Sequence, residues 1–203
     1  MKCRCGKNEA VYNEKLQQYE ICDECKEALY AVMCPAYLLE TGFGDIYKNA
    51  SLKDFKLDFR KQLIIDTDSF KKNLLLTGAS SVGKTYLMAA VASYLIRHGY
   101  SRLDIRFINL IDLLTKSYGE EKYKTFSGYS KIKVLFLDEV IPLNVGVDYN
   151  ILYSLLNERM NRGLVTISSS NYSLDKLNGQ IVTRLLANNG AHYEISRNCW
   201  SKE

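Results

Sequence analysis

Buried and amphipathic stretches alternate along the chain from residue 72 onward, and this alternation predicts its fold. Short apolar runs, typical of strands covered on both faces, occupy residues 73–77, 103–109, 131–139, 164–170 and 191–195. Segments with helical spacing or capping residues separate them, at 86–98, 110–118, 148–162 and 173–188. Because parallel strands need crossover helices, we expect an α/β fold with a parallel five-stranded sheet and helices on both faces.

The chain before residue 72 follows a different pattern. Residues 26–41 predict a helix with one apolar face, which Pro35 kinks or divides into two pieces. After two glycines, residues 45–68 are polar and charged and lead into the first strand of the sheet. We therefore divide the chain into an N-terminal module with its connecting helix, 1–41, and an α/β domain, 42–203.

The amino-acid composition limits the class of protein and the cellular compartment that we expect. The 203 residues are 47% hydrophobic and 25% charged, which is typical of a globular protein rather than a disordered one. A net charge of +4 permits contact with nucleic acid without arguing for it. The chain start has no apolar signal core and no run reaches transmembrane length, so we expect a cytoplasmic protein with no membrane partner.

Two close cysteine pairs near the N-terminus predict a zinc site. Cys3 and Cys5 form the first pair, Cys22 and Cys25 the second, and a short hairpin is expected between them. In a reducing compartment such pairs hold a tetrahedral Zn²⁺, whose binding would stabilise a segment too small for its own core. The alternative is four unrelated thiols. The remaining two cysteines have no partner at metal-ligand spacing and are read as packing residues.

A glycine-rich loop follows the strand at 73–77 and precedes the helix at 86–98. It fits G-x-x-x-x-G-K-[ST], in which backbone N–H groups and the helix N-terminus bind phosphate oxygens. Lys84 would reach the β- and γ-phosphates, and the Thr85 hydroxyl would ligate Mg²⁺. The predicted nucleotide-binding residues are Gly78, Ala79, Ser80, Ser81, Val82, Gly83, Lys84, Thr85 and Tyr86.

Polar side chains end the two strands at 131–139 and 164–170. Asp138 and Glu139 close an almost continuous apolar run, and Asn171 follows the next strand. In open α/β sheets, ligands bind at the carboxyl ends of strands, so these groups would face the nucleotide. Asp138 would then hold the Mg²⁺ ion, and Glu139 would act as the general base that orients and polarises water. Without the phosphate loop, two solvated acids at a strand end would be the simpler reading.

The order of these motifs resembles that of the AAA+ ATPases. Within that class, the cysteine-pair N-terminus, the lead-in with Tyr47 to Ser51 and the compact C-terminus resemble the DnaC/DnaI group of bacterial replicative helicase loaders and the related IstB transposition helpers. The resemblance implies an ATPase that self-associates and acts with a hexameric replicative DNA helicase and single-stranded DNA. Alternatives are an IstB-like transposition helper and a protein that binds the helicase and blocks it.

The resemblance also assigns residues. Asn171 would be the polar residue called sensor 1, although a turn residue is the simpler alternative. Arg184 would reach the nucleotide of a neighbouring subunit, because an apolar stripe on its helix leaves it on the exposed face. A solvated helix arginine is the alternative. Arg197 would be a sensor 2 arginine, although the family's usual ending is not reproduced there.

Residues 115–133 interleave five lysines with aromatic rings. Bases could stack on the rings while the lysines meet phosphates, and the family binds single-stranded DNA near this place. A solvated helix and loop is the competing interpretation.

Overall fold

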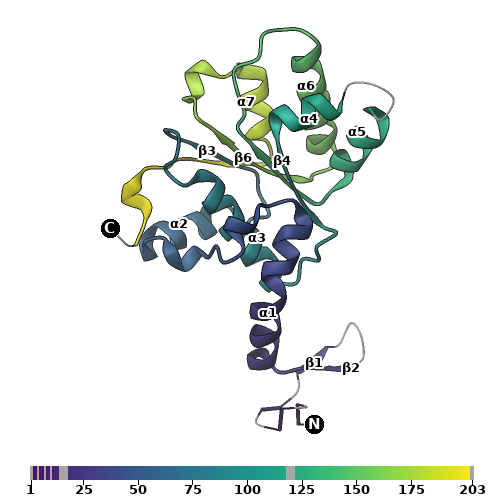
Figure 1. The fold of residues 1–203 in the computed structure, drawn as a ribbon, viewed down its shortest axis with the longest axis vertical. Coiled ribbons are helices and arrows are strands. Elements are labelled where there is room, and N and C mark those ends of the chain that lie inside the picture. The colour runs from purple at the N-terminus through teal and green to yellow at the C-terminus, as the bar shows by residue number, and fades with distance from the viewer. Residues whose placement is uncertain are drawn as a thin grey trace.

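The computed structural model describes residues 2–3, 5–6, 8–9, 11–13, 18–117 and 122–201. One sheet organises the larger part of the molecule, and a long helix projects from that part toward the N-terminal hairpin (Figure 1). The sheet has five parallel strands in the order β4-β5-β6-β3-β7. Their bounds are Leu74–Thr77 (β3), Ile105–Asn109 (β4), Val134–Asp138 (β5), Val165–Ser170 (β6) and Ala191–Glu194 (β7). The predicted parallel α/β sheet is confirmed.

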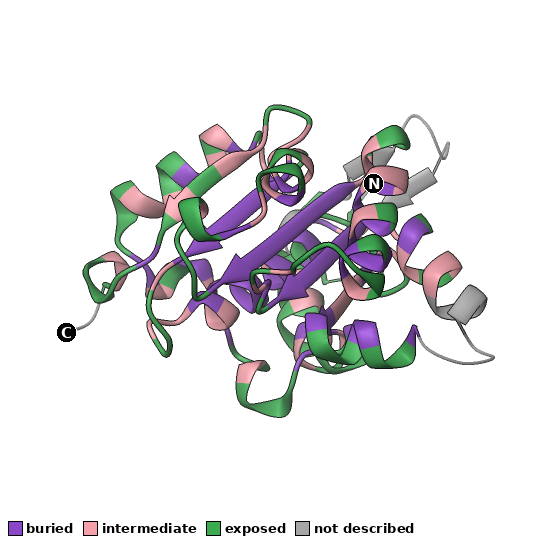
Figure 2. Ribbon diagram, turned by 90° about the horizontal axis from the view of Figure 1, so that it is seen from above, coloured by how far each residue is buried: buried purple, intermediate pink, exposed green. Residues whose placement is uncertain are grey.

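Helices cover both faces of the sheet, as predicted. Leu74 and Leu76 of β3 belong to the core under the helices α1 (Asp23–Thr41), α2 (Leu57–Asp66) and α3 (Lys84–Arg97). Leu75 points to the opposite face and joins the core under the other helices. Those helices are α4 (Leu110–Lys116), α5 (Lys122–Lys131), α6 (Val147–Asn161) and α7 (Gly179–Leu185). Seen from above, the strands lie buried at the centre with more exposed helical surface around them (Figure 2).

The polar segment at 45–68 contains more structure than its composition indicated. It holds two short 3-10 helices, η1 (Asp45–Tyr47) and η2 (Leu52–Asp54), followed by α2. Phe55 and Leu63 of this segment are fully buried in the core with α3 and the sheet, whereas Ile46 and Ile65 are exposed. Because these anchors are widely spaced among charged residues, no helical or strand period was visible.

Helix α1 runs without division from Asp23 to Thr41, with Pro35 inside it. It therefore begins three residues earlier than expected, and Pro35 does not start a second piece. Its C-terminal half contributes Cys34 and Leu38 to the core beside α3, whereas Val32 is 79% exposed on the projecting half. Among the described residues, no helix is both long and apolar enough to cross a bilayer.

The turn after α1 depends on glycine. Gly42 adopts φ 107°, and its backbone N–H caps the last carbonyls of the helix. A Cβ at Gly42 would lie 2.7 Å from the carbonyl oxygen of Phe107 in β4. This close approach fixes α1 against the edge strand of the sheet.

A buried arginine joins α5, α6 and β6. The Arg159 guanidinium, with no exposed surface, donates to the Thr166 hydroxyl and to the carbonyls of Tyr129, Ile132 and Val165. Burial lowers the pKa of Arg159 to about 9. The carbonyls of Tyr129, in the last turn of α5, and of Ile132, just after it, are thereby satisfied inside the protein, which holds the start of β5 in place.

Candidate nucleotide site and cysteine cluster

The loop between β3 and α3 has the conformation that phosphate binding needs. Gly78 and Gly83 adopt φ values of 143° and 99°, and Ser81 between them has φ 62°. A Cβ at Gly83 would lie 2.2 Å from the Trp200 ring, so only glycine fits beneath this indole. The Trp200 Nε1 donates to the Val82 carbonyl at 3.0 Å, which fastens the C-terminal segment to the loop.

Lys84 lies inside the curl of this loop. Its Nζ donates to the carbonyls of Gly78 at 2.8 Å and Ala79 at 2.6 Å. Burial lowers the pKa of the Lys84 ammonium, while the carboxylates of Asp138 and Glu139 oppose that shift. The ammonium is therefore placed to exchange these two carbonyls for the oxygens of a bound phosphate.

Asp138 joins three elements at the carboxyl edge of the sheet. Its Oδ2 accepts from the Thr85 hydroxyl at 2.7 Å, and its Oδ1 accepts from the Ser169 hydroxyl on β6. Asp138 is only 5% exposed. A buried carboxylate beside a threonine hydroxyl supplies the oxygen ligands that Mg²⁺ prefers, so this donor set fits the predicted ion.

Glu139 stands at the rim of the same site in a left-handed backbone conformation, with φ 58°. A non-glycine residue at this φ is strained, and strain of this kind gathers at functional sites. Its backbone N–H donates to the Ser169 hydroxyl at 3.1 Å, and its carboxylate accepts from the Asn109 side-chain amide at 2.6 Å. Asn109 ends β4 and thereby fixes where the carboxylate points.

These groups line one cavity of about 270 Å³. The structure brings together nine of the predicted residues there: Ser80, Ser81, Gly83, Lys84, Thr85, Tyr86, Asp138, Glu139 and Asn171. The cavity wall also contains Tyr47 and Ser169, which sequence reasoning did not select as site residues. Ser169 is the second of three consecutive serines in β6, and its spacing did not mark it as a site residue.

An aromatic wall closes one side of the cavity. The Tyr86 hydroxyl donates to Asp54 Oδ2 at 2.7 Å, and burial together with this carboxylate raises the pKa of Tyr86 to about 12. Tyr47 is half-buried, and burial raises its pKa as well. Both tyrosines therefore stay protonated at neutral pH and tie the 45–68 segment to the nucleotide loop.

Arg184 differs from the prediction, which placed it on an exposed helix face. The residue is half-buried, with its guanidinium 3.7 Å above the Tyr153 ring of α6. It donates to the Tyr153 hydroxyl and, at 2.9 Å, to the carbonyl of Gln180. The apolar stripe of α7 correctly indicated that Arg184 points away from the core. The spacing could not show that a ring of α6, Tyr153, covers the guanidinium. Arg184 does not line the nucleotide cavity of its own chain.

Arg197 lies on the other side of the phosphate loop. It follows β7 in a 3-10 turn (Arg197–Cys199) and lines a second hollow of about 470 Å³ with Lys56, Val82 and Trp200. The hollow shares Ser81 and Gly83 with the nucleotide cavity. Arg197 is thus close to the loop, although outside the cavity that holds Asp138.

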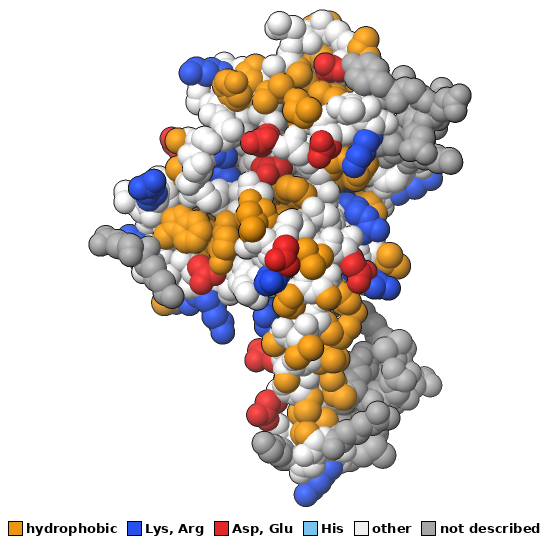
Figure 3. Space-filling view, viewed as in Figure 1, with side chains coloured by type: hydrophobic (Ala, Val, Ile, Leu, Met, Phe, Trp, Pro, Cys, Tyr) orange, Lys and Arg blue, Asp and Glu red, His pale blue; other side chains and the backbone are white. Residues whose placement is uncertain are grey.

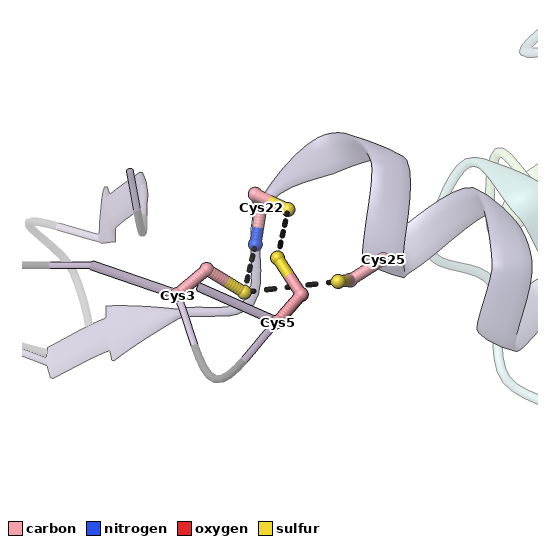
Figure 4. Close-up of side chains that lie close together, drawn as sticks. All are labelled: Cys3, Cys5, Cys22 and Cys25. Carbon is pink, nitrogen blue, oxygen red and sulfur yellow. Dashed lines mark hydrogen bonds between the residues drawn. The ribbon is translucent and has the colours of Figure 1, made fainter. Parts of the chain in front are cut away.

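The four N-terminal cysteines converge at the start of α1 (Figure 4). Their sulfur atoms all lie within 4.8 Å of one another. Cys3 and Cys25 Sγ are 3.8 Å apart, and Cys5 and Cys22 Sγ are 3.7 Å apart. Four thiolates about 2.3 Å from a central Zn²⁺ in a tetrahedron would be about 3.8 Å apart, so the geometry fits the metal. The expected hairpin is present as β1 (Val11–Asn13) and β2 (Gln18–Glu20).

The basic and aromatic segment at 115–133 is only partly described. Residues 118–121 and the side chains of residues 122–125 lie outside the described part of the chain. Phe126 and Tyr129 of α5 are half-buried and pack against the core of α4, α6 and α7. At least these two rings serve packing on the described part of the segment.

The fold and the site together define the class. A strand–loop–helix for phosphate, an Asp-Glu strand end beside it and a parallel sheet with helices on both faces make this an α/β domain of the AAA+ P-loop class. The chain belongs to the IstB-like ATP binding protein family, whose model matches residues 56–188. It is thus an ATP-binding protein.

Similar proteins fall into two groups. Over 70 residues, 34% of this chain and 30% of the relative, it is 37% identical to a putative ATP-binding protein of insertion sequence IS1162 from Pseudomonas fluorescens. Over 52% of this chain and 35% of the relative, it is 30% identical to the replicative helicase loader DnaI of Bacillus subtilis. A solved DnaI structure superposes with a TM-score of 0.62 and 25% identity, covering 76% of this chain and 92% of that one. The chain matches about a third of the length of these curated relatives.

Proposed function

We propose that this protein is an ATPase that binds a hexameric replicative DNA helicase and helps to load it onto single-stranded DNA. The observation that carries the proposal is the likeness to DnaI in both sequence and structure, at a TM-score of 0.62. The cysteine cluster supports it, because the cluster stands at the far end of α1, away from the nucleotide cavity (Figure 1). A small module at the end of a projecting helix is suited to docking on a larger partner.

In this proposal the residues of the cavity divide the work of ATP hydrolysis. Lys84 leaves the Gly78 and Ala79 carbonyls to neutralise charge on the β- and γ-phosphates. Thr85 and Asp138 would hold a Mg²⁺ ion, which supplies charge neutralisation at the phosphates. Glu139 orients and polarises the attacking water, and Asn171 borders the space between Glu139 and the loop.

The helicase assignment is tested by affinity capture from the organism that encodes the protein. We expect the tagged chain to recover the replicative helicase, and a Cys22→Ser/Cys25→Ser variant to lose it while still binding ATP. The matched control, Cys199→Ser, lies outside the cluster and should keep both properties. Recovery of a transposase in place of the helicase would contradict the proposal. A helicase that is captured but no longer reaches single-stranded DNA would show inhibition instead.

A transposition helper is the second candidate, and one observation favours it. The family match and the 37% identical segment both belong to ATP-binding proteins of insertion sequences. The cysteine module weighs against it, because IstB proteins usually lack such a module. Self-association is part of both candidate functions. Arg184 does not line the nucleotide cavity of its own chain, so in either function it would contact the nucleotide of a neighbouring subunit.

The cysteine cluster is expected to hold one Zn²⁺ per chain. Four sulfurs at tetrahedral spacing favour the metal. Elemental analysis of protein purified without chelator should give one zinc, and Cys22→Ser should reduce it. Cys199→Ser is the control that keeps the metal. A folded hairpin with no zinc would refute the assignment.

A further inference from the structure

A basic groove lies on the α3 face of the sheet and shares no lining residue with the nucleotide cavity. It has a volume of about 400 Å³ and runs between η2, α2 and the C-terminal half of α3. Four residues that carry or can acquire positive charge line it: Lys53, Arg60, Arg97 and His98. Because α3 rises 1.5 Å per residue, Arg97 is about 20 Å along the helix from Lys84. Figure 3 shows scattered Lys and Arg side chains at the lower edge of the domain, next to the projecting α1, with acidic side chains close to some of them.

Three cations of this groove have no partner in the described part of the chain. Among the described residues, no ion pair or hydrogen bond engages the side chains of Lys53, Arg60 or Arg97. Several cations elsewhere are paired, for example Lys133 with Asp104 at 2.8 Å. The one carboxylate in the groove lining is Glu27. A surplus of positive charge in a concave surface attracts an anionic partner.

An exposed ring inside the groove narrows the choice of partner. The His98 imidazole stacks on Tyr94 with ring centroids 3.9 Å apart, and Tyr94 in turn packs edge-on against the buried ring of Phe70. His98 Nδ1 lies 2.7 Å from the Tyr94 carbonyl oxygen, which fixes the orientation of the imidazole. A fixed ring between cations is the arrangement on which an unpaired base stacks. An acidic peptide would use the charges but would leave the ring without a role.

We propose that this groove binds single-stranded nucleic acid, with Arg60 and Arg97 on backbone phosphates and a base stacked on His98. The inference deepens the proposed function and rests on it, because it gives the expected contact with single-stranded DNA a location. Phe126 and Tyr129 of the segment at 115–133 pack on the opposite face of the sheet, so the two locations are separable. The groove also reaches Glu27, near the cysteine cluster, so a bound strand passes close to the proposed docking module.

The test measures anisotropy of a short fluorescent oligothymidine with the full chain over a range of salt concentrations. Two lost phosphate contacts should reduce the slope of log K against log salt by about 1.4 in Arg60→Gln/Arg97→Gln. His98→Ala should weaken binding about fivefold or more, because one stacked base is lost. Lys61→Gln/Lys72→Gln is the matched control: it removes two charges outside the groove, one of them from α2.

The proposal is overturned if the control lowers the slope as much as the groove variant does. It also fails if the groove variants bind like the unaltered chain, or if a labelled polyglutamate binds and oligothymidine does not. ATP binding and helicase capture are measured on the same proteins and should be unchanged. If the unaltered chain neither binds ATP nor captures the helicase, the proposed function fails. That result differs from a failure of the groove proposal, which concerns oligothymidine binding alone. Thermal melting of each variant verifies that it folds.

Discussion

Replacing Glu139 by glutamine is expected to lower ATP turnover about 10²–10⁴-fold while ATP binding persists. The amide keeps the size of the side chain and can still hydrogen-bond Asn109, which now lies 2.6 Å from the carboxylate. It cannot take a proton from water, so only the chemical step is affected. Phosphate release and binding of a fluorescent ATP analogue measure the two properties separately. Full turnover in this variant would remove Glu139 from the role of base.

Two further variants sharpen this result. Lys84→Ala should weaken ATP binding itself, because it removes the cation held at the Gly78 and Ala79 carbonyls. Glu194→Gln is the matched control, since Glu194 ends the outer strand β7 at the carboxyl ends of the same sheet without lining the cavity. If Glu194→Gln lowers turnover as Glu139→Gln does, the effect reflects the general charge of this edge rather than one base.

Replacing Arg184 by alanine is expected to remove the activity that depends on assembly, with ATP affinity nearly intact. The guanidinium is stacked on Tyr153 and does not line its own cavity, so it can serve a nucleotide only on another subunit. Arginines that act in this way contribute about 10³–10⁵ in rate. Specific activity of the unaltered protein should rise with protein concentration or with helicase and DNA, and Arg184→Ala should lack that rise.

A mixing experiment tests the same idea more directly. Arg184→Ala subunits combined with Lys84→Ala subunits should recover activity, because each supplies what the other lacks. Arg162→Ala is the control, since Arg162 pairs with Glu158 on the surface of α6 and its loss should change little. A mixture that stays inactive although both variants assemble, or normal hydrolysis by Arg184→Ala, would mean that the arginine lies elsewhere or that the enzyme works as a monomer.

The sheet and the nucleotide loop were predictable because their signals are local. A strand buried on both faces is a continuous apolar run, and the loop carries fixed residue types between a strand and a helix. The carboxyl edge of a parallel sheet then brings Asp138 and Asn171 to the same cavity.

The remaining features of the site depend on contacts between segments far apart in the sequence. Ser169 reaches Asp138 from the next strand, and Asn109 reaches Glu139 from the strand on the other side. Tyr47 comes from a segment whose apolar residues have no period. The half-burial of Arg184 depends on a tyrosine 31 positions away in the chain. No spacing rule along one element could indicate these neighbours.

The contact between Trp200 and the phosphate loop gives the protein an optical property. The sequence has one tryptophan, and its indole packs over Gly83 while hydrogen-bonding to the Val82 carbonyl. All tryptophan emission of this chain therefore arises at the nucleotide loop, beside the rings of Phe55 and Tyr86. Nucleotide binding to the loop can therefore be followed in real time by the change in tryptophan fluorescence, without an attached dye. In a mixture with the helicase, the helicase's own fluorescence is subtracted.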